Sequence, residues 1–172
     1  MKTILFLFAV LIFGLVSCAT RNVSRQQVEE GVVINGVRWA TRNVETPGRF
    51  ARNFVSSGGF FTFEEAQNAC PYGWRLPTRE ELVSLRNAGG EWRIVNGVNG
   101  HIFGTAPNRL FLRAPGERTR TGAIDRAGTD GTYWSSTAID AYTGWTLRFS
   151  SGGNGVSSGN RFFGFSVRCV AE

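Results

Sequence analysis

Four Asn-Gly pairs constrain the fold of this chain more than any other feature of its sequence. They are found at residues 35–36, 96–97, 99–100 and 154–155. Asparagine and glycine tolerate the two positive φ angles of a tight hairpin turn, so such pairs favour antiparallel strands joined by short turns. The 22 glycines among 172 residues are about twice the usual share, which also favours many turns and loops.

The clearest hairpin is expected at residues 32–41. Three β-branched residues precede the pair Asn35-Gly36, and a second strand-like run follows it. In that second run Val37, Trp39 and Thr41 share one face, because side chains alternate along a strand. Trp39 is therefore expected to point into the core.

Two short helices are expected after the hairpin. Segments 62–65 and 78–81 both have the sequence Thr-x-x-Glu, the capping box in which each side chain bonds a free backbone N–H of the other residue. Apolar residues spaced by three and four carry the first helix to Cys70, where Pro71 ends it. The second helix is expected to end at residues 88–90.

Further strands are expected in the Gly-rich half that follows residue 92. They are placed at residues 108–112, 132–136, 143–149 and 162–170. Residues 150–160 are interpreted as a polar, Ser- and Gly-rich loop. A hairpin, two helices and then several strands predict an α+β fold, with two short helices packed on a mainly antiparallel sheet with long loops.

Residues 1–17 are expected to be an export signal and not part of the fold. Lys2 gives a positive start, and the apolar stretch that follows is too short for a comfortable membrane span. Residues 15–18, Leu-Val-Ser-Cys, then resemble the lipobox of bacterial lipoproteins, in which the cysteine is acylated by palmitate-type chains. The predicted lipidation site is Cys18, and a short uncleaved signal anchor is the alternative.

The polar residues 18–30 are interpreted as a lipidated tether, which leaves residues 31–172 as the folded domain. Ala19 follows Cys18, and by resemblance to the sorting rule of Gram-negative lipoproteins this favours the outer membrane, on its surface or its periplasmic face. The cleaved chain carries eighteen arginines against thirteen acidic residues, a formal charge of +5. Because the arginines are scattered singly, no nucleic-acid partner is expected; the expected partner is the membrane, through the lipid on Cys18.

Four strings resemble one family of exported bacterial domains. They are INGVRWATRNV at residues 34–44, ACPYGWRLPT at 69–78, YWSST at 133–137 and SVRCV at 166–170. Together they are similar to the Fibrobacter succinogenes major paralogous domain, found in exported proteins of Bacteroidetes and Fibrobacteres. The resemblance covers roughly residues 31–172.

The resemblance implies a C-type-lectin-like fold. Such domains often join a cysteine of an early helix to one in the last strand, which implies a disulfide between Cys70 and Cys169. Export to an oxidising compartment agrees with that pairing. Two buried free thiols are the alternative.

Catalysis is not expected. His101 is the only histidine, which excludes histidine-rich metal sites, and the chain has neither a nucleophile elbow nor a His-Glu-x-x-His motif. The stretches 106–108 and 134–136 lack the acids with which C-type lectins ligate calcium. The sequence therefore predicts no catalytic residue, no metal and no cofactor.

Ligand-binding residues are expected in the loops of the C-terminal half. Tyr142 and Trp145 lie beside a Gly/Thr turn and could stack on a sugar or a protein, and Arg148 and Asn154 follow in the same region. The predicted function is an exported lipoprotein that displays its domain for binding or adhesion to a glycan or protein. The alternatives are a structural or accessory subunit of an envelope assembly, recognised through an edge strand, or an enzyme of a rare class.

Overall fold

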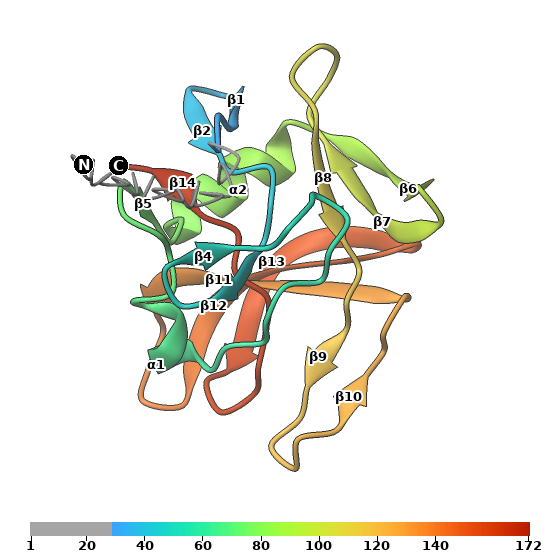
Figure 1. Cartoon of the computed structure of the whole chain (residues 1–172). Coiled ribbons are helices and arrows are strands. Elements are labelled where there is room, and N and C mark those ends of the chain that lie inside the picture. The colour runs from blue at the N-terminus through green and yellow to red at the C-terminus, as the bar shows by residue number, and fades with distance from the viewer. Residues whose placement is uncertain (1–28) are drawn as a thin grey trace, which may run out of the picture.

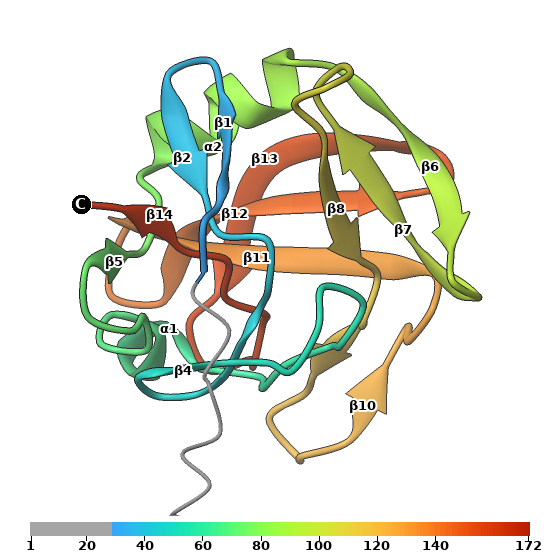
Figure 2. The same ribbon diagram turned by 45° about the horizontal axis from the view of Figure 1, so that its top comes forward.

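Three long antiparallel strands form the centre of the molecule (Figures 1 and 2). They are β11 (Asp130–Ala138), β12 (Thr143–Ser150) and β13 (Gly153–Asn160), and they lie in that order in one sheet, here called the central sheet. The structure is a computed structural model that describes residues 29–172. The predicted signal segment and Cys18 lie outside the described residues.

Side chains alternate across the central sheet and supply two separate hydrophobic clusters, one on each face. Tyr133, Leu147 and Phe149 belong to the first cluster, which also contains Leu82 and Leu85. Trp134 follows Tyr133 in the chain and therefore points to the opposite face, where it belongs to the second cluster. The central sheet is thus a shared wall between two cores.

The first face is covered by a hairpin, a helix and a second sheet. The hairpin consists of β1 (Val32–Ile34) and β2 (Val37–Trp39), and the helix is α2 (Arg79–Asn87). The second sheet contains β6 (Gly90–Val95), β7 (Val98–Phe103) and β8 (Leu110–Arg113) in that order. Trp39 is buried in the first cluster, which confirms the expectation that it points into the core.

The second face is covered by shorter elements. They are β3 (Val44–Thr46), β4 (Arg49–Phe50), α1 (Phe63–Ala66) and β5 (Trp74–Arg75). A final strand, β14 (Val170–Ala171), lies between β2 and β5, while β9 (Glu117–Arg118) and β10 (Ile124–Asp125) form a separate hairpin. Trp134 meets Phe63 edge-on, with 5.3 Å between ring centroids, and donates its indole N–H to the Phe61 carbonyl at 2.7 Å.

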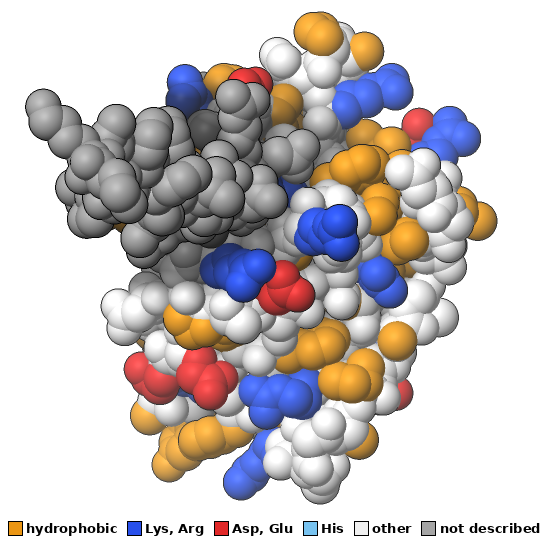
Figure 3. Space-filling view, in the orientation of Figure 1, with side chains coloured by type: hydrophobic (Ala, Val, Ile, Leu, Met, Phe, Trp, Pro, Cys, Tyr) orange, Lys and Arg blue, Asp and Glu red, His pale blue; other side chains and the backbone are white. Residues whose placement is uncertain are grey.

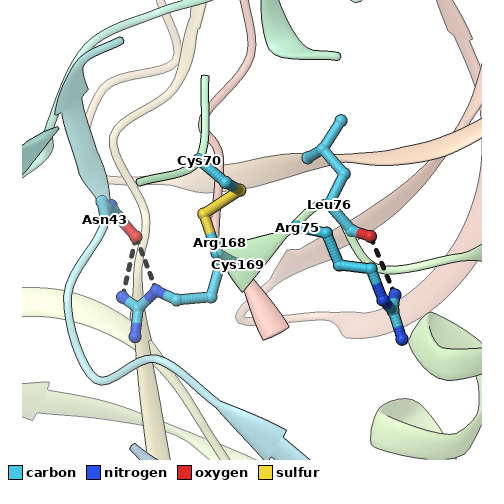
Figure 4. Close-up of a disulfide and its surroundings, with 6 residues drawn as sticks. All are labelled: Asn43, Cys70, Arg75, Leu76, Arg168 and Cys169. Carbon is cyan, nitrogen blue, oxygen red and sulfur yellow. Dashed lines mark hydrogen bonds between the residues drawn. A yellow bond between two sulfur atoms is a disulfide. The ribbon is translucent and has the colours of Figure 1, made fainter. Parts of the chain in front are cut away.

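A disulfide joins Cys70 to Cys169, as the resemblance implied (Figure 4). The two cysteines are 99 residues apart, and their Cα atoms lie 6.0 Å from each other. The bond ties the segment after α1 to the chain just before β14. It therefore fixes the C-terminal end of the domain against its N-terminal half.

The predicted α+β, C-type-lectin-like fold is wrong. The described chain is mostly β, built from several small antiparallel sheets, and its helices contain only 4 and 9 residues. The capping boxes of Thr62 and Thr78 are both confirmed, but a capping box determines where a helix begins and not how far it continues. The first helix ends at Ala66; beyond it the Ala69 N–H donates to the Ala66 carbonyl three residues back, and the Ala69 carbonyl accepts from the Gly48 N–H.

Eight of the described strands were not predicted and one was misplaced; the eight are β3, β4, β5, β6, β7, β9, β10 and β13. The predicted loop 150–160 contains β13, and the segment after α2 forms β6 and β7. The predicted strand at 162–170 is irregular up to Val170, because Phe165 and Ser166 make single bridges to Phe61 on one side and to β11 on the other. The polar, Gly-rich composition of 150–160 did not indicate a strand, because β13 pairs with the much more apolar β12.

Candidate functional site

A groove opens on both sides of Phe54, which lies in the loop between β4 and α1 that spans residues 51–59. The Phe54 ring is 38% exposed and stands between two hollows that share Thr41 and Phe54 in their lining. The hollows have volumes of about 390 and about 580 Å³. Both volumes lie in the range of small-ligand sites, and we refer to the two hollows together as the Phe54 groove.

The smaller hollow is apolar and faces the sheet of β6, β7 and β8. Its floor includes Ile102 and Phe111, which lie opposite each other in the β7–β8 register and therefore share a face. Phe54 meets Phe111 edge-on, with 6.2 Å between the ring centroids. Arg109 is exposed at the rim, so a cationic group borders an otherwise apolar hollow.

The loop that carries Phe54 is held from two directions. The Arg113 guanidinium of β8 donates to the Val55 carbonyl at 3.1 Å, and the Asn43 amide donates to the Ser57 carbonyl at 2.8 Å. At Gly58, where φ is +70°, a Cβ would lie 2.8 Å from the Cβ of Asn43. This close approach requires glycine at position 58. It allows the loop that carries Phe54 to pack closely against Asn43 and Val44.

The larger hollow is lined by both polar and apolar surface, and Glu29, Glu30, Arg42 and Asn53 supply its polar side chains. The carboxylate of Glu29 is almost fully buried and accepts from the Thr41 N–H at 2.7 Å, the Thr41 hydroxyl at 2.8 Å and the Arg42 Nε at 2.7 Å. Burial alone would raise the pKa of Glu29, but these donors outweigh it and hold the pKa below its ordinary value. Glu29 is therefore a charged structural group at the base of the hollow and not a proton donor.

Positive charge on the face seen in Figure 3 is dispersed and does not form one patch. Figure 3 shows blue arginine side chains separated from one another by hydrophobic and uncharged surface. Many arginines have acidic neighbours, as in the pairs Arg75–Glu81 and Arg93–Glu91. On this face, the arginines of the described residues form no continuous stripe.

Two of the predicted ligand-binding residues lie on the first face of the central sheet. The Trp145 ring packs under the guanidinium of Arg79, with 4.5 Å from the guanidinium carbon to the ring centroid. The Asn154 side-chain amide lies 3.2 Å from Nε2 of His101. Both side chains are thus engaged within the domain.

The other two predicted ligand-binding residues lie elsewhere. Arg148 faces the second cluster, where Nη2 lies 3.5 Å from Glu117 and the guanidinium lies over the Phe165 ring. Tyr142 is 68% exposed at the turn between β11 and β12. The structure therefore does not bring Tyr142, Trp145, Arg148 and Asn154 together, and only Tyr142 presents a largely free side chain.

His101 is buried between β7 and the central sheet. Its ring stacks on Phe103 with 4.3 Å between centroids, and its Nδ1 has no hydrogen-bond partner among the described residues. Burial lowers the pKa of His101 below its ordinary value. A neutral ring packed among aromatic side chains is a core residue and lacks the access that a general base needs.

Residues from the four sequence strings at 34–44, 69–78, 133–137 and 166–170 meet inside the domain, and Figure 4 shows several of them. Arg168 donates from Nε and Nη2 to the Asn43 Oδ1 at 2.9 and 2.7 Å, and from Nη1 to the Ala40 carbonyl at 3.0 Å. The Asn43 amide also donates to the Tyr133 hydroxyl at 3.2 Å. Three of the four strings thus contribute to one buried network, which has a structural role.

The Phe54 groove was not predicted from the sequence. The one local signal is the apolar pair Phe54-Val55 inside a loop of Arg, Asn, Ser and Gly. The pair belongs to no hairpin or helix pattern that would explain its apolar character. Across residues 29–172, no three His, Cys, Asp or Glu side chains gather as a metal site. Neither helix in that range has the length and apolar character needed to cross a bilayer.

Comparisons of the chain with protein-family models, with curated proteins and with solved structures found no match.

Proposed function

We propose that this chain is a lipid-anchored envelope protein whose β-rich domain binds an external ligand in the Phe54 groove and performs no catalysis. The observation that carries the proposal is the partly exposed Phe54 ring between an apolar hollow and one that also has charged and amide side chains. Sites for small ligands combine apolar walls with a few polar groups in this way. The lipobox-like segment and the similarity to exported paralogous domains support placement in the envelope, with the outer membrane as the expected location.

A glycan is the ligand class that the groove favours. A sugar ring has an apolar face that packs on an aromatic side chain and hydroxyl groups that bond polar side chains. Phe54 and Phe111 offer the first kind of contact, while Asn53, Glu30 and Arg42 border the second. A protein partner usually binds through a broad contact surface, so two separate hollows of this size would add less to its affinity than to the affinity of a small ligand.

The anchor and the groove lie close along the chain. Glu29 lines the larger hollow, and the segment from Cys18 to Glu29 spans at most roughly 40 Å when fully extended. Acylation of Cys18 would therefore keep the groove near the membrane surface. Metabolic labelling with an alkyne fatty acid tests the anchor: label is expected on the natural chain and none on Cys18→Ser.

Glycan-array binding of the purified full chain tests the ligand proposal. Phe54→Ala is expected to reduce the array signal by about tenfold, since it removes a ring contact of about 1 kcal/mol or more at the centre of the groove. Tyr142→Ala is the matched control, an exposed aromatic residue outside the groove lining. Loss of signal in Tyr142→Ala with retention in Phe54→Ala would move the site to the β11–β12 turn, and binding to proteins alone would replace the glycan class.

A further inference from the structure

The outer edge of β13 is long and has no strand beside it among the described residues. Eight consecutive residues of β13 pair with β12 in an unbroken register, from Gly153 opposite Ser150 to Asn160 opposite Thr143. Among the described residues, no backbone hydrogen bond joins residues 153–159 to any element other than β12. Alternate N–H and C=O groups of a strand point away from its neighbour, so this edge presents unpaired groups along its length.

The opposite edge of the central sheet is already covered. Ser166 bridges β11 in parallel, with its N–H donating to the Thr132 carbonyl and its own carbonyl accepting from Trp134, both at 3.1 Å. The Gly116 N–H donates to the Asp130 carbonyl at 2.8 Å farther along the same edge. Backbone bonds therefore close the β11 side of the central sheet, whereas no strand of the described domain pairs with the outer side of β13, although α2 packs against β13 (Figure 2).

Natural proteins protect long edges with charges, prolines, bulges or short strands. The β13 sequence GNGVSSGN contains no charge and no proline, and its register has no bulge. The six-residue edge of β6 shows the contrast, because it carries the exposed pair Glu91 and Arg93 with 2.9 Å between their charged groups. The protection present on β6 is absent from β13.

We propose that β13 is a self-association edge, at which two copies of this chain pair antiparallel across a two-fold axis and join their central sheets into one. A two-fold axis places the same segment on both sides of the contact, so the segment must not repel itself. β13 meets that condition in a chain whose formal charge is +6, since it is uncharged over all eight residues. Its Gly, Ser, Asn and Val side chains are also small enough to face their own copies without a clash.

Single-cysteine cross-linking in cells that express the full chain tests this pairing. Cys70 and Cys169 are joined to each other, so an added cysteine is the new thiol of the described domain. Cysteines are placed one at a time at Gly155, Val156, Ser157 and Ser158, with Ser151→Cys in the β12–β13 turn as the control. Opposed residues of antiparallel strands lie within the Cα distance that a disulfide spans. A disulfide-linked dimer is expected to peak at one of the four positions, which marks the two-fold axis, and to be absent for Ser151→Cys.

A charge placed on the edge provides the second test. Ser158 is exposed, and Ser158→Lys in the best cross-linking background is expected to lower the dimer band by about fivefold, because both copies then bring a cation to the same edge. If the best background is Ser158→Cys, the lysine is placed at Gly155, where a Cβ meets nothing within 4 Å. Ser151→Lys is the matched control and should leave the band unchanged. Three results would each overturn the self-association proposal: equal cross-linking at all four positions, a dimer band that the lysine does not reduce, or cross-links only to a different protein. None of these results depends on whether the Phe54 groove binds a glycan.

Discussion

Arg168 is a fully buried cation whose hydrogen-bond partners are all neutral. Its guanidinium is held by one side-chain oxygen of Asn43 and one main-chain oxygen of Ala40. Burial lowers the pKa of Arg168 to about 10, so the group is still charged at neutral pH. The stability of this region therefore depends on a single amide side chain that satisfies a buried charge.

Asn43→Ala is expected to lower the free energy of unfolding by about 3 kcal/mol or more, because it leaves two N–H groups of a buried guanidinium unpaired. Asn43→Asp keeps the acceptor but removes the amide donors to Ser57 and Tyr133, and a smaller loss is expected. Urea denaturation of the three proteins measures both effects. Equal stability of Asn43→Ala and the natural chain would show that Arg168 does not depend on Asn43.

His101 predicts how stability depends on pH. Its pKa is lowered in the folded chain, while the unfolded chain takes up the proton near pH 6.5. The unfolded state then binds more protons, so the stability that His101 contributes is complete above about pH 6.5 and is lost as pH falls toward the folded pKa. Glu91 is the acidic group that acts on His101 and opposes this loss only in part.

Urea denaturation at pH 7.5 and pH 5.5 tests that sign. The natural chain is expected to be less stable at pH 5.5, and His101→Gln is expected to show a smaller difference between the two values. Since His101 is the only histidine, no other imidazole titrates in this interval. A natural chain that is more stable at pH 5.5 would contradict the assignment of a buried neutral ring.

At the scale of elements, the Asn-Gly pairs play two different roles. Asn35 and Asn96 have φ of 50° and are followed by glycines with φ of 81° and 76°, which confirms the expected turn at 35–36 and places another between β6 and β7. Gly100 and Gly155 instead lie inside β7 and β13. The dipeptide alone does not distinguish a turn from a strand position.

Gly100→Ala and Gly155→Ala form a matched pair. A Cβ at Gly100 would lie 2.6 Å from the Phe111 ring and closer still to the Leu112 carbonyl, while a Cβ at Gly155 has nothing within 4 Å. Gly100→Ala is expected to cost about 1–3 kcal/mol of stability and Gly155→Ala about zero. Thermal unfolding of the two variants measures the difference, and equal melting temperatures would contradict the packing described for β7.

Local signals predicted the parts of the fold that local chemistry determines. The capping boxes of Thr62 and Thr78 and the turn at Asn35-Gly36 depend on residues within four positions of each other, and all three are present. The fold class was wrong because it depends on which segments pair over long distances. β13 is the clearest case, since its small polar residues become a strand only beside the apolar Leu147 and Phe149 of β12.

The candidate site was beyond local signals for the same reason. The Phe54 groove combines a residue before β1, a loop after β4 and three strands near residue 100. The predicted ligand-binding residues were close in sequence, but alternation along β12 separates Trp145 from Arg148. Residues that are close in sequence along β12 thus lie on opposite faces of the central sheet.

At the scale of the whole molecule, the disulfide joins the two halves of the chain. It closes a loop across a separation of 99 residues, for which chain entropy gives about 4–5 kcal/mol of stabilisation as an upper figure. Reduction, or Cys70→Ala with Cys169→Ala, is expected to lower the melting temperature by more than 10 °C in a domain of this size. Retention of the melting temperature after verified reduction would show that the two hydrophobic clusters hold the fold without the bond.

Glu29 also determines where mechanical load enters the domain. Any pull along the chain from residues before Glu29 first meets the bonds that its carboxylate makes with Thr41 and Arg42, and those residues line the Phe54 groove. The central sheet and the disulfide lie beyond that point along the load path. A force applied at residue 29 is therefore expected to strain the groove before it strains the central sheet, and single-molecule pulling on residue 29 should give its first extension step there.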